Sequence, residues 1–445
     1  MLIENEMGIL EEKLTLKEQL LTQFELKAAA MSESDSIKAH RKKAIDNFDI
    51  LALPNKKQEE WKYSNAEALF KEEFALAPVA TIAEEELEKL LIPNLDANRS
   101  IIINGSYSET LSQINALPAG VIITSFSKAM KAYPTLVEQH FANYADYGVD
   151  AFTALNTAFA TDGLFIYIPS HTLLEKPLHL INIVTSAKNA LVIPRHLIIV
   201  EKGAALKIIE SFETVRLTAK AISLSVTEVV IGENAKVQYY KLQNEGGSAV
   251  HINTTQAQQS LNSHFDTNTI TLNGNWLRNN LNIVLAAKNC ETHLNGLFLL
   301  KDNMHLDNHT LVDHQQPHCE SNQLYKGILS GKSTGVFNGK IYVRKDAQKT
   351  NAYQSSKNIL LSDEATMNTK PQLEIYADDV KCSHGSSTGQ ISPEALFYLQ
   401  SRGIGKDMAK KLLMFAFAAD AINTIHIAAL QDYISKRIEE NLLSN

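Results

Sequence analysis

The sequence predicts a mainly β protein with helical regions before and after its β core in the chain, and a parallel β-helix suits that core best. From about Leu164 to His384, short β-prone runs follow one another with turn residues between them. Hardly any long helix fits in this stretch, so a doubly wound fold is excluded, because it needs helices between its strands. The runs are too many for one simple sandwich, whereas a β-helix stacks short strands turn upon turn. The repeat is not strict, so the pattern alone leaves a sandwich or a barrel open.

The region before the β core reads as helical and then mixed. Leucines and Phe24 recur at roughly helical spacing near the N-terminus, and a second helix is predicted from about Ser36 to Asn47. Helical patches and a short apolar run share the stretch from Thr81 to Asp150. We therefore expect three parts: a helical and mixed region at 1–160, a β-helix core at 161–390, and a helical region at 391–445.

The last part of the chain returns to helix. Ser392-Pro393 is typical of a helix N-cap followed by proline at the first helical position. The next helical run, KDMAKKLLMFAFAADAI, is apolar on most sides and therefore needs burial. Its side chains either contact another subunit or pack on the chain's own β core, and the sequence does not choose between the two. The residues in question are Leu412, Leu413, Phe415 and Phe417.

Composition narrows the class of protein. The chain has 445 residues and a formal net charge of −8, which argues against nucleic acid or an anionic membrane as its main partner. Its three cysteines are too few for a disulfide framework, and an odd number cannot all pair within the chain. The N-terminal residues lack the pattern of a signal peptide, and no apolar run approaches the roughly 20 residues that span a bilayer. We expect a cytoplasmic protein.

Cys382 and His384 are the first candidate ligands. Residues i and i+2 of a strand point to the same side, so a Cys-x-His pair presents a thiolate and an imidazole together, and both bind iron or zinc. Gly385 and Gly389 suggest a tight turn and close backbone approach beside them. From spacing alone, a structural role for the pair is favoured over a ligand role.

A second group combines four histidines and a cysteine within one short stretch, but its spacing matches no standard zinc pattern. On short strands these side chains would point to different faces, so a hydrogen-bonded role is favoured over a metal site. The group consists of His305, His309, His314, His318 and Cys319.

The segment from Gly327 to Ser333, GILSGKS, looks like a phosphate-binding loop but has one residue too few between its glycines, and a strand-like run follows it. We reject nucleotide binding there.

Five long segments stand out: RKKAIDNFDILALPNKKQEEWKYS, ALNTAFATDGLFIYIP, PRHLIIVEKGA, FNGKIYVRKDAQKTNAYQSSKNILLSDEATMNTKPQLEIYADDVKCSHGSSTGQI and FYLQSRGIGKDMAKKLLMFAFAADAI. Together these segments resemble the SufB/SufD family of iron–sulfur cluster assembly proteins. They lie in order over nearly the whole chain. The closing KCSHG motif is typical of the SufD-type branch of the family, since SufB-type chains carry a His-Glu pair there.

The resemblance implies a right-handed parallel β-helix and a non-catalytic scaffold subunit. It also implies a heterodimer with a SufB-type scaffold through the β-helices, a SufC-type ATPase docked on the C-terminal helices, and a homodimer where the SufB-type partner is missing. A transient iron–sulfur cluster would form at the SufB-type interface, with His384 as a ligand and Cys382 second. No cofactor would stay bound to this chain alone, and we find no flavin motif.

One alternative comes from another class of protein. Some β-helix enzymes act on polysaccharides with surface carboxylates, and Asp302, Asp307 and Asp313 are the candidates for that role. The presence of only two tryptophans argues against an aromatic-rich sugar groove. A purely structural homodimer is a third alternative.

Overall fold

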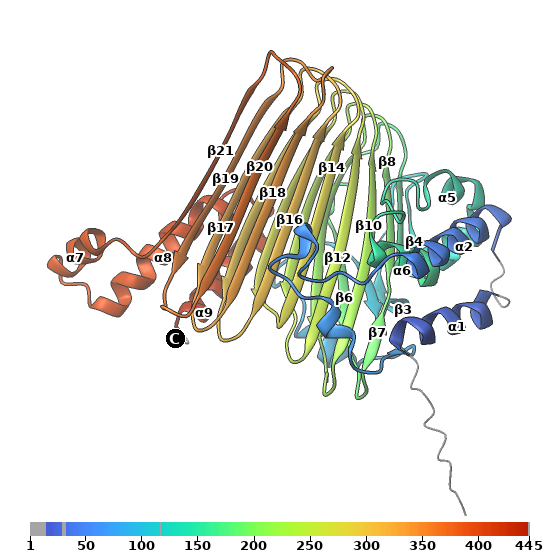
Figure 1. Cartoon of the computed structure of the whole chain (residues 1–445), viewed down its shortest axis with the longest axis horizontal. Coiled ribbons are helices and arrows are strands. Elements are labelled where there is room, and N and C mark those ends of the chain that lie inside the picture. The colour runs from blue at the N-terminus through green and yellow to red at the C-terminus, as the bar shows by residue number, and fades with distance from the viewer. Residues whose placement is uncertain (1–14, 29–32, 116, 444–445) are drawn as a thin grey trace, which may run out of the picture.

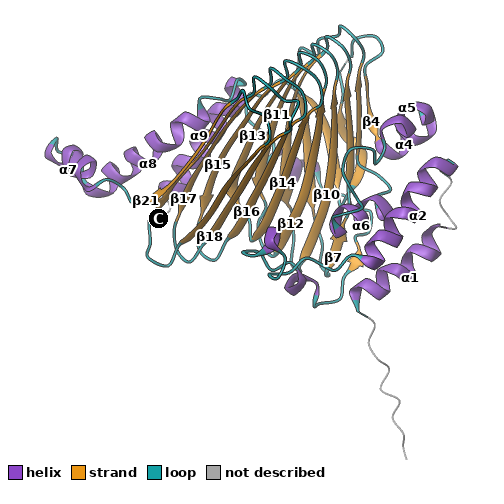
Figure 2. Ribbon diagram, turned by 45° about the horizontal axis from the view of Figure 1, so that its top comes forward, coloured by secondary structure: helices purple, strands orange, loops and turns teal. Residues whose placement is uncertain are grey.

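The centre of the molecule is a parallel β-helix (Figure 1). The computed structural model describes residues 15–28, 33–115 and 117–443. The chain winds through about eight turns, and each turn contributes one strand to each of two facing sheets (Figure 2). Successive turns pair in parallel, as when Glu291 lies opposite Glu320 and Glu320 lies opposite Asn351. The predicted fold class is therefore confirmed.

Sheet 1, with 11 strands, and sheet 2, with 10 strands, form the two walls of the β-helix. In spatial order, sheet 1 contains β20 (Thr366–Ile375), β18 (Thr334–Val343), β16 (His305–His314), β14 (Trp276–Leu285), β12 (Ala249–Gln259), β10 (Ala221–Ile231), β8 (Arg195–Val200), β5 (Leu164–Ile168) and β4 (Ile122–Ser125), with β7 (Ala190–Val192) and β1 (Ala75–Leu76) beside β10. Sheet 2 contains β21 (Lys381–Gly389), β19 (Asn351–Leu360), β17 (Glu320–Leu329), β15 (Glu291–Leu300), β13 (His264–Asn273), β11 (Lys236–Asn244), β9 (Ala205–Thr214), β6 (Leu178–Val184), β2 (Asn98–Ile103) and β3 (Ser106–Gln113). In the described part of the chain, only β3 and β4, at the N-terminal end, pair antiparallel to their neighbours.

The burial of the strands follows from what covers them. The early strands β6 and β8 are buried at every residue and read as nearly continuous apolar runs, as strands covered on both faces do. The late strand β19 alternates strictly between the interior and the outside over most of its length. The last strand, β21, has almost every residue exposed.

The outer face of sheet 1 is covered by the N-terminal region. A shared apolar core joins α2, α6 and the segment around Trp61 to outward side chains of β8, β10 and β12. The elements of this region are α1 (Leu16–Ala28), α2 (Asp35–Ile50), the 3-10 turns η1 (Glu59–Trp61) and η2 (Glu67–Phe70), α3 (Glu84–Glu88), α4 (Phe126–Ala132), α5 (Pro134–His140) and α6 (Ala151–Phe159). Of these, α3 packs instead on sheet 2, against β2 and β6. The Glu228 carboxylate on β10 fixes the loop after α5, because it accepts hydrogen bonds from the backbone N–H groups of Ala142, Tyr144 and Ala145 at 3.0–3.1 Å.

The outer face of sheet 2 is covered by the C-terminal helices α8 (Lys406–Ile422) and α9 (Ala428–Leu443). Lys326 on β17 holds α8 in place: its ammonium lies 2.5 Å from the Asp420 carboxylate and 4.6 Å from the Phe417 ring centroid. The preceding helix, α7 (Pro393–Ser401), has no buried residue and stands clear of the β-helix in Figure 1.

One corner of the β-helix repeats the same backbone conformation from turn to turn. Asn234, Asn262 and Asn289 each adopt a positive φ, between 55° and 58°, which asparagine tolerates better than most residues. Their side-chain amides hydrogen-bond to one another at 3.1 and 2.9 Å. His318 and Lys349 continue the same conformation at 62° in the next two turns. The positive-φ residue thus recurs two positions before each of β11, β13, β15, β17 and β19.

Candidate functional site at the open end of the β-helix

Cys382 and His384 lie on β21, the last described strand of sheet 2, which pairs with β19. Cys382 lies opposite Ala352, and His384 lies opposite Gln354. Both of those β19 residues face the interior, since Ala352 is fully buried and the Gln354 amide donates to Gln323 at 2.8 Å. Paired residues of neighbouring strands point to the same face. The two candidate ligands therefore face the interior of the last turn.

The interior of that last turn is open. Its other wall is β20, whose Met367 and Leu373 are half-buried against the core below them. Both β20 and β21 stand at the ends of their sheets, and the chain then leaves the β-helix for α7 (Figure 1). Pro371 within β20 fits this position, because an edge strand tolerates a residue without an N–H group. The described part of the chain thus places no cap over the interior of the last turn.

The two candidate ligands differ in environment. The Cys382 side chain is half-buried among Ile341, Val343 and Ala352, and this burial raises the pKa of its thiol. His384 is exposed at the open end. Imidazole and thiolate both bind iron, and two ligands leave most of a tetrahedral site to be filled from elsewhere. A partner that covers the open end could supply the rest.

The turn expected at Gly385 and Gly389 is wrong. Gly385 lies in the middle of β21 and Gly389 ends it, and neither has a positive φ. A side chain at either position would meet open space, so these glycines are not required for close packing within the chain. The lack of side chains at these two exposed positions instead leaves room for close approach by a neighbouring molecule.

The second histidine group is distributed over several faces. His305 and His309 point outward from β16, whereas His314 points inward, where Nε2 lies 2.9 Å from Ser321 Oγ and burial lowers its pKa to about 4. His318 lies in an exposed turn, and Cys319 is buried in the core. Among the residues that the structure describes, no three His, Cys, Asp or Glu side chains are arranged to hold a metal ion.

The GILSGKS segment spans the end of β17 and the turn that follows, and it opens no helix. This agrees with rejecting it as a phosphate-binding loop.

A buried polar network that the sequence did not predict ties the N-terminal region to sheet 1. Asp307 accepts hydrogen bonds from Arg278 at 2.7 Å and from the Ser64 hydroxyl at 2.5 Å, and His309 Nε2 lies 2.9 Å from its other oxygen. Arg278 also donates to the Glu60 carbonyl, and its guanidinium stacks 3.6 Å from the centroid of Trp61. We call these residues the strap network. Three residues of the strap network, Glu60, Trp61 and Ser64, lie in the EEWKYS segment. Nothing in the sequence of that segment indicates which strands it contacts.

The strap network keeps Asp307 ionised. Burial works to raise the pKa of this carboxyl, but the charge of Arg278 and the contacts with His309 and Ser64 outweigh it and hold the pKa well below its usual range. Although Ser64, His305 and Asp307 match the residue types of a hydrolase triad, the Ser64 hydroxyl donates to Asp307 and can only accept from His305. Ser64 is fully buried, so the arrangement is structural.

The carboxylates proposed for a polysaccharide enzyme do not form a catalytic pair. Asp307 is committed to Arg278, and Asp313 is bound to Arg344 by two bonds of 2.7 and 2.9 Å. The two aspartates lie near opposite ends of β16, which is roughly 20 Å along a strand. Paired glycosidase carboxyls lie about 5–10 Å apart. Asp302 is in the exposed turn before β16.

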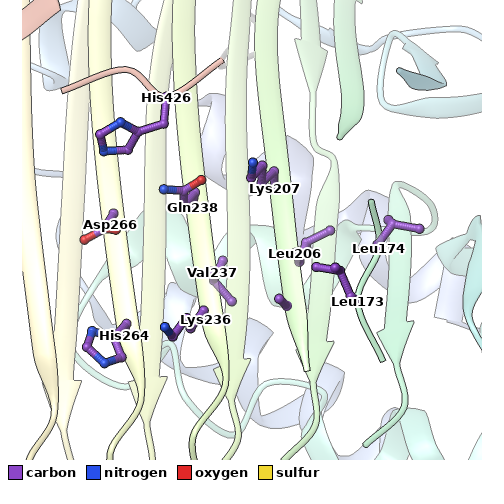
Figure 3. Close-up of a pocket in the computed structure, with 11 residues that line it drawn as sticks. Leu173, Leu174, Leu206, Lys207, Lys236, Val237, Gln238, His264, Asp266 and His426 are labelled. Atoms are coloured by element: carbon purple, nitrogen blue, oxygen red, sulfur yellow. The ribbon is translucent and has the colours of Figure 1, made fainter. Parts of the chain in front are cut away.

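Two of the hollows on the outer walls of the β-helix are large enough to consider as ligand sites. A groove of about 910 Å³ runs between the 51–61 segment and sheet 1, and its cations Arg278, Lys340 and Arg344 are all ion-paired. A pocket of about 410 Å³ lies on sheet 2 beneath His426 (Figure 3). Its polar side chains lie on β9, β11, β13 and, for His426, on the segment before α9, and they do not converge on one point.

The match to known proteins now decides the family. Residues 183–417 match the family model described as the SufBD core domain of the SUF system for FeS cluster assembly, and residues 14–180 match the SufBD N-terminal region. The chain belongs to the SufBD family. The resemblance inferred from the sequence is confirmed.

Several SufBD relatives are similar over most of their length. An iron–sulfur cluster assembly SufBD family protein of Synechocystis is 32% identical over 417 residues, which cover 91% of this chain and 92% of that protein. The iron–sulfur cluster assembly protein SufD of Escherichia coli is 30% identical, over 88% of this chain and 89% of the relative. The SufD protein of Bacillus subtilis is 24% identical, over 97% and 99%.

The SufBD chain places the four candidate partner-binding residues on α8, with different exposure. Leu412 is 45% exposed and Phe415 is 39% exposed, whereas Leu413 is half-buried and Phe417 packs against Lys326 of the β-helix. One face of the helix is thus buried on sheet 2, and the other remains uncovered. No helix within residues 15–28, 33–115 and 117–443 is long and apolar enough to cross a membrane.

Proposed function

We propose that this chain is a SufD-type, non-catalytic scaffold subunit of the SUF assembly complex. In this proposal it pairs with a SufB-type subunit through the open end of the β-helix and binds a SufC-type ATPase through its C-terminal helices. It helps to acquire iron and to build a nascent iron–sulfur cluster where the two scaffold subunits meet. The cluster is cargo that leaves, so no cofactor stays on this chain. The few free cysteines fit a cytoplasmic location.

The observation that carries the pairing is the open last turn. The outer edges of β20 and β21 face no further strand of the described chain, and such edges attract another strand unless they are covered. Ile375, Tyr376 and Tyr353 are exposed near these edges, at 39%, 56% and 44%. A second β-helix laid against the end would extend both sheets and cover the interior. A SufB-type subunit of the same family supplies such an end.

The chemistry of the proposed site follows from the side chains that face this end. His384 offers an imidazole, and Cys382 offers a thiol whose raised pKa keeps it protonated until a metal displaces the proton. A site with mixed ligands from two chains holds iron less tightly than four thiolates from one chain would, which suits a cluster that must be released. His384 is the main ligand in this proposal, and Cys382 is secondary.

The proposed ATPase-binding surface is apolar and lies on α7 and α8. Phe397, Tyr398 and Met408 are 72%, 58% and 52% exposed, and Leu412 and Phe415 continue the same surface. Large exposed side chains gathered on two adjacent helices mark a protein-interaction site. The charged residues among them, such as Lys406 and Asp407, suit the rim of such an interface.

The test is co-expression of the chain with its two presumed partners, followed by measurement of stoichiometry, iron and sulfide. His384→Ala should lower cluster formation on the complex at least tenfold while the three proteins still co-purify. Ser383→Ala is the matched control, since Ser383 is exposed on the same strand but points to the outer face. Normal iron–sulfur maturation with His384→Ala would show that the ligand assignment is wrong.

Stoichiometry tests the pairing separately. One copy of this chain should co-purify with one SufB-type chain. A homodimer of this chain should form only when the SufB-type subunit is left out. If the chain remains a monomer with the SufB-type subunit present, the open end is not the pairing surface.

A further inference from the structure

Cys290 and Cys319 occupy equivalent positions in successive turns of the β-helix. Each follows the positive-φ residue of the repeating corner and immediately precedes a strand of sheet 2, β15 or β17. The N–H of Glu320 donates to the carbonyl of Cys290 at 2.9 Å, so the two corners are directly stacked. Both side chains belong to the apolar core and are at most 1% exposed.

The two thiols lie side by side. Cys290 Sγ is 3.1 Å and Cys319 Sγ is 3.2 Å from the same acceptor, the carbonyl oxygen of Ala287. Paired strands are about 4.8 Å apart, which is within the Cα separation of about 4.4–6.8 Å that a disulfide needs. A bond between the two sulfur atoms therefore requires little movement of the backbone.

We propose that Cys290 and Cys319 form a redox-active dithiol, which a small peroxide oxidises to a disulfide between two turns of the β-helix. The pair lies in the wall of the β-helix, separated from Cys382 by the intervening strand β19. This inference does not depend on the proposed scaffold function, because it uses neither the open end nor the C-terminal helices.

The reaction needs one nucleophilic and one resolving thiol, and the corner distinguishes them. The neighbouring thiol is the largest influence on each group: the Cys319 thiol lowers the pKa of Cys290, and the Cys290 thiol, together with burial, raises the pKa of Cys319. Cys290 is therefore the thiolate that attacks the peroxide. An S–O bond forms as the O–O bond breaks, and the departing hydroxide takes a proton and leaves as water. The product is a sulfenic acid on Cys290.

The second step closes the disulfide. Cys319 attacks the Cys290 sulfur, an S–S bond forms, the S–O bond breaks, and the hydroxyl leaves with the thiol proton as a second water. Two thiols have then lost two electrons and two protons, and one peroxide has become two waters. The named co-reactant is a peroxide such as hydrogen peroxide.

The thiols are buried, but only beneath one turn. Ala287 is half-buried, and Lys288 and Asn289 next to it are exposed. A molecule as small as hydrogen peroxide needs only a local opening of this turn, whereas a bulky thiol reagent needs the corner to unfold. The corner therefore selects for small oxidants.

The test uses the full-length chain, purified in reductant and then exposed to hydrogen peroxide. Free thiols are counted after quenching and denaturation, and peptides are mapped with and without reduction. The count should fall from three to one, with Cys382 still free and with a cross-linked peptide pair containing Cys290 and Cys319 that separates on reduction. Cys382→Ser should fall from two thiols to none at the same rate.

Two variants keep the proposal falsifiable. Cys319→Ser should form no cross-link, and a sulfenic-acid probe should label Cys290 instead. Cys290→Ser should do neither, and it should fold, because serine already occupies the equivalent corner at Ser263. Retention of all three thiols in the folded wild-type chain, or a cross-link that involves Cys382, would overturn the proposal.

Discussion

Replacing Asp307 with alanine should release the N-terminal strap from the β-helix. The change removes the acceptor of Arg278 and Ser64 and leaves the buried Arg278 guanidinium, only 3% exposed, without its ion partner. Removing one partner of a buried pair costs about 3–5 kcal/mol, because the remaining charge stays away from water. We expect this free energy to be lost from the contact between residues 59–64 and strands β14 and β16.

The two tryptophans of the chain report on this contact. Trp61 lies against Arg278 at 3.6 Å, and Trp276 stacks on His305 with 5.2 Å between ring centroids. In a denaturant titration of Asp307→Ala, the change in tryptophan emission should occur at a clearly lower denaturant concentration than the unfolding of the β-helix, which circular dichroism follows. In the wild type the two signals should lie much closer together.

A matched control sits on the same strand. Asp313 also pairs with an arginine, but the Arg344 side chain is 52% exposed, so Asp313→Ala should cost only about 0–1 kcal/mol. The double variant Arg278→Met with Asp307→Leu should recover part of the loss, because no unpaired charge remains. If Asp307→Ala and Asp313→Ala shift the tryptophan transition equally, the strap network does not hold the N-terminal region.

Three further outcomes follow from the structure. Burial raises the pKa of Glu213 under α9 to about 8, so the folded chain binds this proton more tightly than the unfolded chain. The contribution of Glu213 to the stability of the fold should therefore fall as the pH rises from about 4.5 to 8. Over that range, the thermal midpoint of Glu213→Gln should rise relative to that of the wild type. Phe415→Asp should reduce co-purification of the ATPase at least tenfold, whereas Val79→Asp, at an exposed apolar residue of the N-terminal region, should not. Gly296→Ala should lower the thermal midpoint of the β-helix, because the added methyl would lie 2.3 Å from the Tyr325 ring.

Much of the β core could be predicted because its local pattern is strong. Short β-prone runs without helices between them, with turn residues at their ends, already indicate stacked strands. The pairing of each strand with the one two positions further on was not predictable, because turns of unequal length hide the repeat. Glu291 pairs with Glu320, and Glu320 pairs with Asn351, so the second of these two turns is longer than the first.

The sequence predicted that the two candidate ligands share one face of a strand, but not which face of the β-helix that is. The i, i+2 spacing of Cys382 and His384 predicts a shared face, and β21 has that geometry. Which face this is depends on Gln354 and Ala352, which lie a full turn of the β-helix earlier in the sequence. The glycine turn was wrongly predicted for the same reason: Gly385 lies on an extended edge strand, where pairing with β19 sets the conformation.

The sequence by itself determined the class of fold, the helical ends and the family, because these depend on local composition, periodicity and long matching segments. Only the tertiary structure decided which side chains meet. Cys290 and Cys319 are far apart in the sequence, and the spacing between them matches no motif, yet the coiling of the chain brings both thiols to one carbonyl oxygen. In a β-helix, neighbours in space are one turn apart in sequence, so contacts across turns cannot be read until the length of each turn is known.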